Sequence, residues 1–150
     1  MKAENAIITA VSKVFAGAHT AAYRVTRGRF GNRFRGNDIL LLTVRGRKSG
    51  DPHTTPVLYL RDGADYLIAA SNGGFDWEPQ WWRNLRVNPD AEIEVGGQRI
   101  AVRADQLQGD ERAKVWARLV AALSAFTGYQ DKVHREIAIV RLHPTEIGSR

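Results

Sequence analysis

The chain contains no cysteine, which excludes disulfide bonds, thiolate metal sites, iron–sulfur clusters and a cysteine nucleophile. It also has no apolar run near the ~20 residues that a bilayer-spanning helix needs. The N-terminal stretch resembles a signal peptide only weakly, because Glu4, Ser12 and Lys13 interrupt the apolar segment. We therefore expect a mature cytoplasmic protein.

The sequence has no metal-binding pattern either. The four histidines, His19, His53, His134 and His143, lie far apart and show no ligand spacing. We expect no metal site.

The sequence has an excess of basic residues. Its 150 residues carry a net charge of +6, with 43% hydrophobic and 25% charged residues, which fits one soluble domain over residues 1–150. Five arginines crowd between residues 24 and 35. They form either a solvated face or a patch for an anionic cofactor or lipid. Nucleic acid is not expected as a partner, because no binding motif accompanies the arginines.

Apolar periodicity predicts an α+β, mainly β protein: a small antiparallel barrel with an N-terminal helix and other helices packed outside. The turns carry Asp-Gly and Gly-Gly signals. We expect a helix over residues 4–23, followed by a basic loop to residue 36. Strands are expected over residues 38–45, 54–61, 65–71 and 136–142, and a hairpin over residues 91–105. A short helix is expected near Pro79, and another from Asp110, as its cap, to about Phe126.

The segment "TVRGRKSGDPHTTP" raises the question of a phosphate loop. A Walker loop needs glycine directly before the Lys-Ser pair and again five residues earlier, where this chain has Arg47 and Leu42. No helix follows, so we reject a nucleoside triphosphatase. The segment is instead a hairpin whose tip either binds an anion through exposed amides and charged side chains or is simply a solvated turn.

A second glycine segment, "ASNGGFDWEPQWWRNL", places Trp77, Trp81 and Trp82 next to two glycines. The tryptophans can be core anchors. Alternatively, the glycines let backbone amides lie against a flat heterocycle. The residues alone leave both interpretations open.

Taken together, "LLLTVRGRKSGDPHTTPVLYL", "ASNGG", "PQWWRNLRVNP", "ERAKVWARLV" and "YQDK" resemble the deazaflavin (F420)-dependent nitroreductase family, also described as F420-dependent quinone reductases. The similarity runs from about Tyr23 to Leu142. It implies a split β-barrel, coenzyme F420 as cofactor, and hydride transfer from deazaflavin C5 to a hydrophobic acceptor. The acceptor would be a quinone, an enone or other activated alkene, or a nitro-aromatic compound.

The resemblance also implies a cofactor site. The hairpin would bind the phosphate and acidic tail of the cofactor, the next strand would run beneath it, and the glycine loop would face the ring. His53 stands where the family usually has arginine, which weakens that contact at pH 7. The implied cofactor-binding residues are Arg47, Lys48, Ser49, His53, Thr54, Thr55, Pro56, Val57, Ala70, Ser71, Asn72, Gly73, Gly74, Pro79, Trp81, Asn84 and Leu85.

On the substrate side, the resemblance implies Ser71 and Tyr129 as catalytic residues. Trp77, Leu123, Phe126 and Tyr129 would line the acceptor. Leu123 and Phe126 replace tyrosines found in some members, so a hydrophobic quinone or enone fits better than a nitroimidazole.

Rival interpretations remain open. One keeps the fold with flavin mononucleotide (FMN) as cofactor, and another makes the protein a non-catalytic F420 carrier. A third adds peripheral membrane association through contact of the N-terminal helix and arginines with anionic lipid. The sequence allows a monomer or a homodimer.

Overall fold

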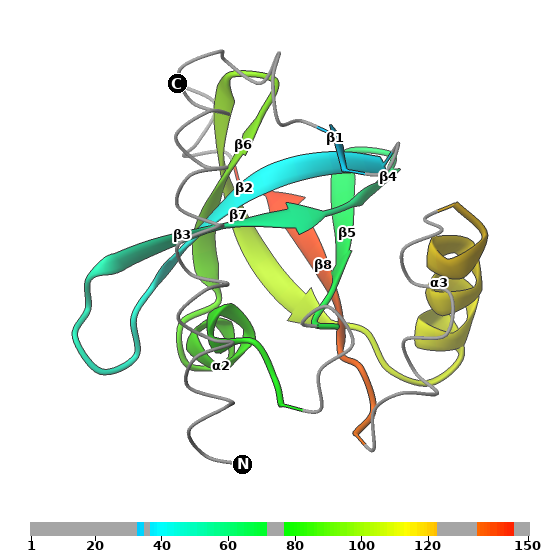
Figure 1. The fold of residues 1–150 in the computed structure, drawn as a ribbon. Helices are drawn as coiled ribbons and strands as arrows, with labels where there is room; N and C mark the ends of the chain where they lie inside the picture. Colours follow the sequence, from blue (N-terminus) through cyan, green and yellow to red (C-terminus); the bar gives the residue numbers. More distant parts are fainter. Residues whose placement is uncertain (1–32, 35–36, 72–76, 123–134, 146–150) are drawn as a thin grey trace.

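The computed structural model describes residues 33–34, 37–71, 77–122 and 135–145. They form one antiparallel sheet that wraps into a barrel, with two helices packed against it (Figure 1). The elements are β1 (Arg33–Phe34), β2 (Asn37–Arg45), β3 (Pro52–Leu58), β4 (Leu60–Asp62), β5 (Asp65–Ala69), α2 (Gln80–Val87), β6 (Asp90–Val95), β7 (Gln98–Gln106), α3 (Gly109–Ala122) and β8 (Ile139–Pro144).

The barrel closes through a strand that has two different partners. The sheet runs β1-β2-β6-β7-β8-β5-β4, and β3 pairs with the free side of β2. Because only Tyr59 separates β3 from β4, these two form one bent strand that joins β2 to β5. The Tyr59 N–H donates to the Asp38 carbonyl at 3.2 Å, which holds the bend against β2.

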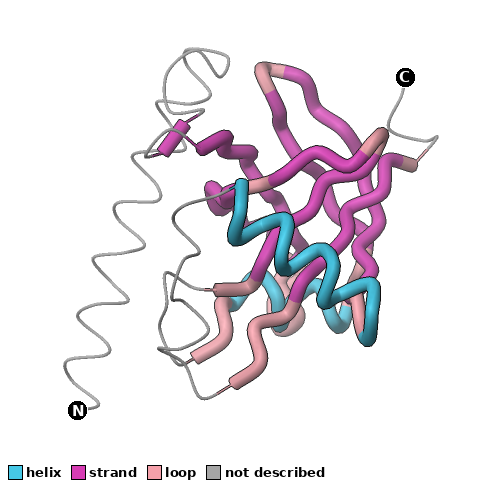
Figure 2. The backbone as a smooth tube through the Cα atoms, turned by 90° about the vertical axis from the view of Figure 1, so that its right-hand side faces the viewer, coloured by secondary structure: helices cyan, strands magenta, loops and turns pink. Residues whose placement is uncertain are grey.

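Alternation along β5 and β8 separates two apolar clusters, because successive strand residues point to opposite faces. Tyr66 and Ile68 point into the barrel core, whereas Leu67 and Ala69 point outward toward α3. Figure 2 shows α3 lying across the outside of the strands. The outer cluster consists of Leu67, Ala69, Leu107, Val115, Leu119, Ile137 and Ile139.

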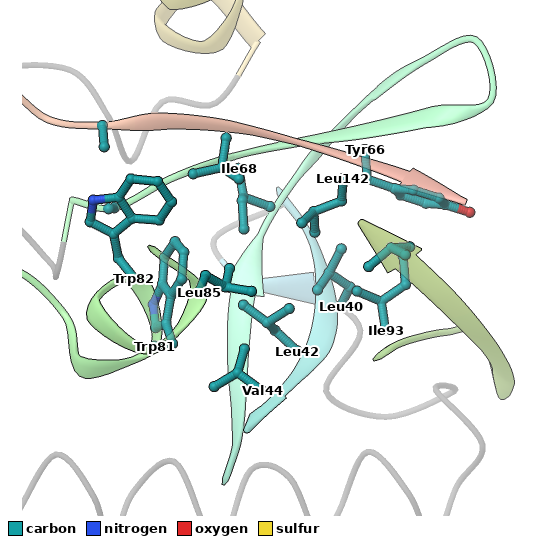
Figure 3. Packing of buried hydrophobic residues seen from close by; sticks show 14 residues of the cluster. Leu40, Leu42, Val44, Tyr66, Ile68, Trp81, Trp82, Leu85, Ile93 and Leu142 are labelled. Carbon is teal, nitrogen blue, oxygen red and sulfur yellow. The ribbon is translucent and has the colours of Figure 1, made fainter. Parts of the chain in front are cut away.

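Helix α2 packs against one end of the barrel and completes the inner core. Trp81, Trp82 and Leu85 are buried there together with Leu42 and Ile68 (Figure 3). The two indole rings meet edge to face, with centroids 6.5 Å apart. Aromatic side chains of this size fix a short helix that has little stability of its own.

The predicted mainly β barrel is confirmed in its described part, as are its two glycine turns. Gly63 has φ of +60° between β4 and β5, and Gly96 and Gly97 have φ of +57° and +86° between β6 and β7. These left-handed conformations favour glycine, so the Asp-Gly and Gly-Gly signals identify the turns correctly.

Three expectations differ from the structure or lie beyond it. The strand expected over residues 54–61 begins earlier and breaks at Tyr59. Asp110 lies inside the first turn of α3, which begins at Gly109, so it is not the cap; there its charge still favours the positive end of the helix dipole. The predicted N-terminal helix and most of the basic loop lie outside the described residues.

Candidate functional site

The hairpin between β2 and β3 has a tightly defined tip. The Gly46 N–H donates to the Asp51 carbonyl at 2.8 Å, and the Gly50 N–H donates to the Gly46 carbonyl at 2.9 Å. The Ser49 hydroxyl accepts from the Asp51 N–H at 3.1 Å. These bonds leave the side chains of Lys48 and Ser49 exposed. The tip therefore presents a cation and a hydroxyl on a fixed backbone.

Arg47 ties this hairpin to α2. Its main-chain N–H and its Nη1 both donate to Asn84 Oδ1, at 3.1 and 2.8 Å, and its Nη2 donates to Gln80 Oε1 at 3.0 Å. Asn84 is only 5% exposed, which makes it one of two buried polar residues in the described part of the chain. Both acceptors are neutral amides, so these contacts orient the guanidinium without cancelling its charge.

Gly46 lies close to the His53 side chain. A Cβ atom at position 46 would lie 2.9 Å from His53 Nε2 and 3.0 Å from Ser49 Oγ. His53 pairs with Val44 across the ladder and its side chain is exposed. The missing side chain at Gly46 thus lets the imidazole lie against the hairpin backbone.

Strand β3 divides its predicted site residues between two faces. Thr55 and Val57 pair with Leu42 and Leu40, which point into the core, so they share the inner face. The neighbouring residues, Thr54 and Pro56, share the outer face, where the hydroxyls of Thr43 and Thr54 lie 2.7 Å apart. One ligand can therefore contact the side chains of only one pair, and main-chain groups must supply any contact with the other.

Ser71 lies two residues beyond the end of β5 and is buried at 7% exposure. The Ala70 N–H donates to the Ala138 carbonyl at 2.8 Å beside β8. The carbonyls of Ala70, Ser71 and Trp77 all accept from the guanidinium of Arg135, at 2.9, 3.3 and 3.3 Å. The predicted Asn72, Gly73 and Gly74 lie outside the described residues.

Helix α2 uses its predicted residues in different ways. Trp81 and Leu85 are buried in the core at 7% and 1% exposure, so their side chains hold the helix on the barrel. Pro79 precedes the first turn, and Asn84 faces the hairpin. The core-anchor interpretation therefore describes Trp81 and Trp82, while Trp77 is half-buried before the helix.

The structure joins some predicted residues and adds two that sequence reasoning missed. It brings Arg47 to Asn84, although 37 positions separate them. Gln80 and Arg135 were missed, because each acts through contacts that no local pattern announces. The predicted substrate residues Leu123, Phe126 and Tyr129 lie outside the described residues.

A second ionic cluster lies where the β4–β5 turn meets β8 and α3. Arg141 Nη1 contacts Asp62 at 2.7 Å and Asp65 at 3.0 Å, and Nη2 contacts Glu111 at 3.1 Å. Hydrogen bonds from Arg141 and then Arg118 hold the pKa of Asp62 below its ordinary value. Burial opposes ionisation of Asp65, but its bonds to His143 and Arg141 outweigh burial and lower its pKa.

Neither membrane spanning nor metal binding has support in the described ranges. None of the helices there is both long and apolar enough to cross a bilayer. The same residues contain no group of three or more His, Asp or Glu side chains arranged to hold a metal ion.

The barrel, its outer helix and the basic hairpin define a split β-barrel protein. The structure is similar to a solved F420-H2-dependent reductase, FDR-A, which is 30% identical with a TM-score of 0.65, over 70% of this chain and 93% of that one. A model of the F420H(2)-dependent quinone reductase family matches residues 16–144. The chain belongs to that family.

Two further proteins are similar to this chain. An F420H(2)-dependent quinone reductase of Mycobacterium tuberculosis is 43% identical over 129 residues, which cover 83% of this chain and 86% of that protein. A solved structure described as a domain-swapped dimer is 27% identical, with a TM-score of 0.67 over 85% of this chain and 93% of that one. The family is one of oxidoreductases that use F420, so the chain is an F420-dependent enzyme.

Proposed function

We propose that this protein oxidises reduced F420 and passes the hydride to a quinone. Family membership supports the cofactor and the acceptor class. The observation that carries the proposal to this chain is the Arg47–Asn84 contact, which fixes a cationic hairpin beside α2. Placed there, the hairpin is suited to the phosphate and acidic tail of the cofactor.

The residues present fit that anionic group. Lys48 and Ser49 are exposed at the tip, and Arg47 is held by neutral amides, so its positive charge remains available to an anion. Glycine at position 46 keeps the backbone beside His53 free of a side chain, and a Cβ atom would fill that space. Cationic side chains and a hydroxyl can bind a phosphate or carboxylate through charge-assisted hydrogen bonds.

The work of the protein is then binding and orientation. When bound in its reduced form, the deazaflavin would supply a hydride from C5. Arg47, Lys48 and Ser49 would hold the anionic end, and Asn84 and Gln80 orient the arginine. Such anchoring would help to position the hydride donor against the acceptor, where small displacements change rates strongly.

We further propose that Ser71 hydrogen-bonds the acceptor and that Tyr129 lies on the substrate side. Support for Ser71 is its burial just after β5, where Arg135 donates to its main-chain carbonyl. A serine hydroxyl can donate a hydrogen bond, and a quinone oxygen can accept it. Enones and nitro-aromatics share the electron-poor character of quinones and remain secondary candidates.

Cofactor titration followed by turnover tests the proposal. Tryptophan fluorescence quenching is measured with F420 and, separately, with FMN, and oxidation of reduced F420 is then followed with a soluble quinone. We expect saturable binding of F420 and quinone-dependent oxidation. Preference for FMN would overturn the cofactor, and F420 binding without turnover would favour a carrier.

A matched pair of variants locates the binding. Lys48→Ala removes a cation at the hairpin tip, whereas Lys114→Ala removes one from an exposed position on α3. We expect weaker F420 binding only for Lys48→Ala, because a charge-assisted contact is lost. Equal affinities for the two variants would exclude the hairpin as the anion site.

A further inference from the structure

Arg135 was not among the predicted site residues, but its side chain contacts three of them. It lies four positions before β8 begins at Ile139, and its side chain is half-buried. Its guanidinium donates to three main-chain carbonyls: those of Ala70 and Ser71, which follow β5, and that of Trp77, three positions before α2.

These carbonyls need a donor because the sheet ends beside them. The last strand pair between β5 and β8 is Ala69 with Ile139, and one further bond joins Ala70 to Ala138. Beyond that point Ser71 is buried without the strand ladder. Buried carbonyls that lack a partner carry a desolvation penalty, and a guanidinium with five donors on a planar fork can satisfy several of them together.

We propose that Arg135 is a positioning residue of the active site. It clamps Ala70 and Ser71, which follow β5, to Trp77, three positions before α2, and this fixes the backbone that carries Ser71. The catalytic consequence rests on the proposed function, since Ser71 is the group that the clamp would place against the acceptor. The clamp itself is a property of the protein without cofactor.

Arginine suits this role better than lysine. A lysine ammonium has three donors at one point, whereas the guanidinium nitrogens are spread over a rigid plane. The carbonyls of Ala70 and Trp77 come from different chain segments, and Arg135 reaches them with two different guanidinium nitrogens. Arg135→Lys should therefore keep the charge but retain only part of the function.

The matched control is Arg112, another half-buried arginine beside the same segment. Its Nη2 donates to the Ile137 carbonyl at 2.7 Å, and its Nε lies 2.9 Å from Glu136. It thus binds a main-chain carbonyl next to β8 without contacting Ser71 or Trp77. Arg112→Gln reports what loss of such a contact does to the fold alone.

The experiment compares full-length Arg135→Gln, Arg135→Lys and Arg112→Gln with the unchanged protein. Hydrogen exchange of residues 69–71 and 77–78 is measured by mass spectrometry without cofactor. Melting temperature, kcat and KM for quinone reduction follow. Arg135→Lys also serves if Arg135→Gln does not fold.

We expect Arg135→Gln to speed exchange at the clamped residues on the order of tenfold, with β6 and β7 unchanged. Loss of the fixed geometry should lower kcat by tenfold or more, on the order expected for small displacements at a reacting centre. Arg135→Lys should give exchange rates and a kcat between those of Arg135→Gln and the unchanged protein. Arg112→Gln should change neither quantity.

Unchanged exchange at residues 69–71 and 77–78 in both Arg135 variants would overturn the clamp. Identical effects of Arg135→Gln and Arg112→Gln on exchange and kcat would overturn it as well, because the role would then be general stability. Absence of F420-dependent activity in the unchanged protein would defeat the proposed function instead, and the exchange result would still decide the clamp.

Discussion

Two arginines of this barrel have opposite surroundings. Arg141 on β8 meets three carboxylates, those of Asp62, Asp65 and Glu111. Arg47 at the β2–β3 hairpin meets the amide oxygens of two side chains on α2. Figure 1 shows that the β4–β5 turn and this hairpin lie at different ends of the barrel.

The difference lies in whether the positive charge is cancelled. Carboxylates around Arg141 neutralise it, so that cluster joins β4, β5, β8 and α3 and contributes to stability. Amides hold Arg47 in one orientation and leave its charge available to an anion. An overall charge of +6 cannot distinguish the two cases, but their hydrogen-bond acceptors can.

The largest effect on stability is expected from Arg141→Met, which leaves Asp62 and Asp65 facing each other without their shared cation. The Arg141 side chain is 20% exposed, so we expect a loss of about 2–3 kcal/mol, below the cost for a fully buried pair. Urea unfolding measures it, and F420 affinity should not change. The control is Arg103→Met, which breaks an exposed pair with Asp90; a loss equal to the control would show that the cluster has no special role.

Asn84→Asp should make the hairpin resemble the Arg141 cluster. The new carboxylate would lie against the Arg47 guanidinium and cancel the charge that the cofactor needs. We expect F420 affinity to fall roughly tenfold, about 1.4 kcal/mol, while the melting temperature stays the same or rises. Gln80→Glu, at an exposed acceptor of the same guanidinium, should have a smaller effect. Unchanged affinity in Asn84→Asp would mean that Arg47 does not contact the anion.

Acidification should affect the cluster in a defined direction. The folded protein holds the pKa values of Asp62 and Asp65 below the ordinary value of 3.8. Their stabilising contribution is therefore complete above that value and is lost as pH falls through the lowered pKa values. Melting temperatures measured below about pH 4 should fall more steeply for the unchanged protein than for the Asp62→Asn/Asp65→Asn double variant. Parallel curves would contradict this.

The smallest effect is expected from Gly46→Ala. The new Cβ atom would meet the His53 imidazole at 2.9 Å, but this exposed ring can move aside. Stability should change by less than about 1 kcal/mol, and F420 affinity should fall two- to threefold, roughly 0.5 kcal/mol. Adding His53→Ala removes the contact with the imidazole, so a double-mutant cycle should show that the two changes are not additive in stability. Additive effects of Gly46→Ala and His53→Ala on stability would show that the imidazole is not the group that the new Cβ atom meets.

Much of the fold follows from local signals. Alternating apolar residues and the Gly63 and Gly96-Gly97 turns suffice for most strands. Barrel closure does not follow, because it depends on the bend at Tyr59 that lets one strand pair with both β2 and β5. Such a pairing is a long-range property with no local pattern.

The candidate site is predictable as a set of segments and less so residue by residue. Resemblance located the hairpin, the end of β5 and α2, and the structure brings Arg47 and Asn84 together. The resemblance could not show that Trp81 is buried in the core, or that Thr54 and Thr55 face opposite sides of the strand. The lone Arg135 lies 65 positions from Ala70, so only the folded chain reveals their contact.

The position of β8 in the sheet also bears on how the protein is made. This strand lies between β7 and β5, and it is synthesised after both. Until it emerges from the ribosome, each of those strands has an unpaired edge that can join other chains. We therefore expect that a premature stop before Ile139 would leave β5 and β7 with unpaired edges and give an aggregation-prone product.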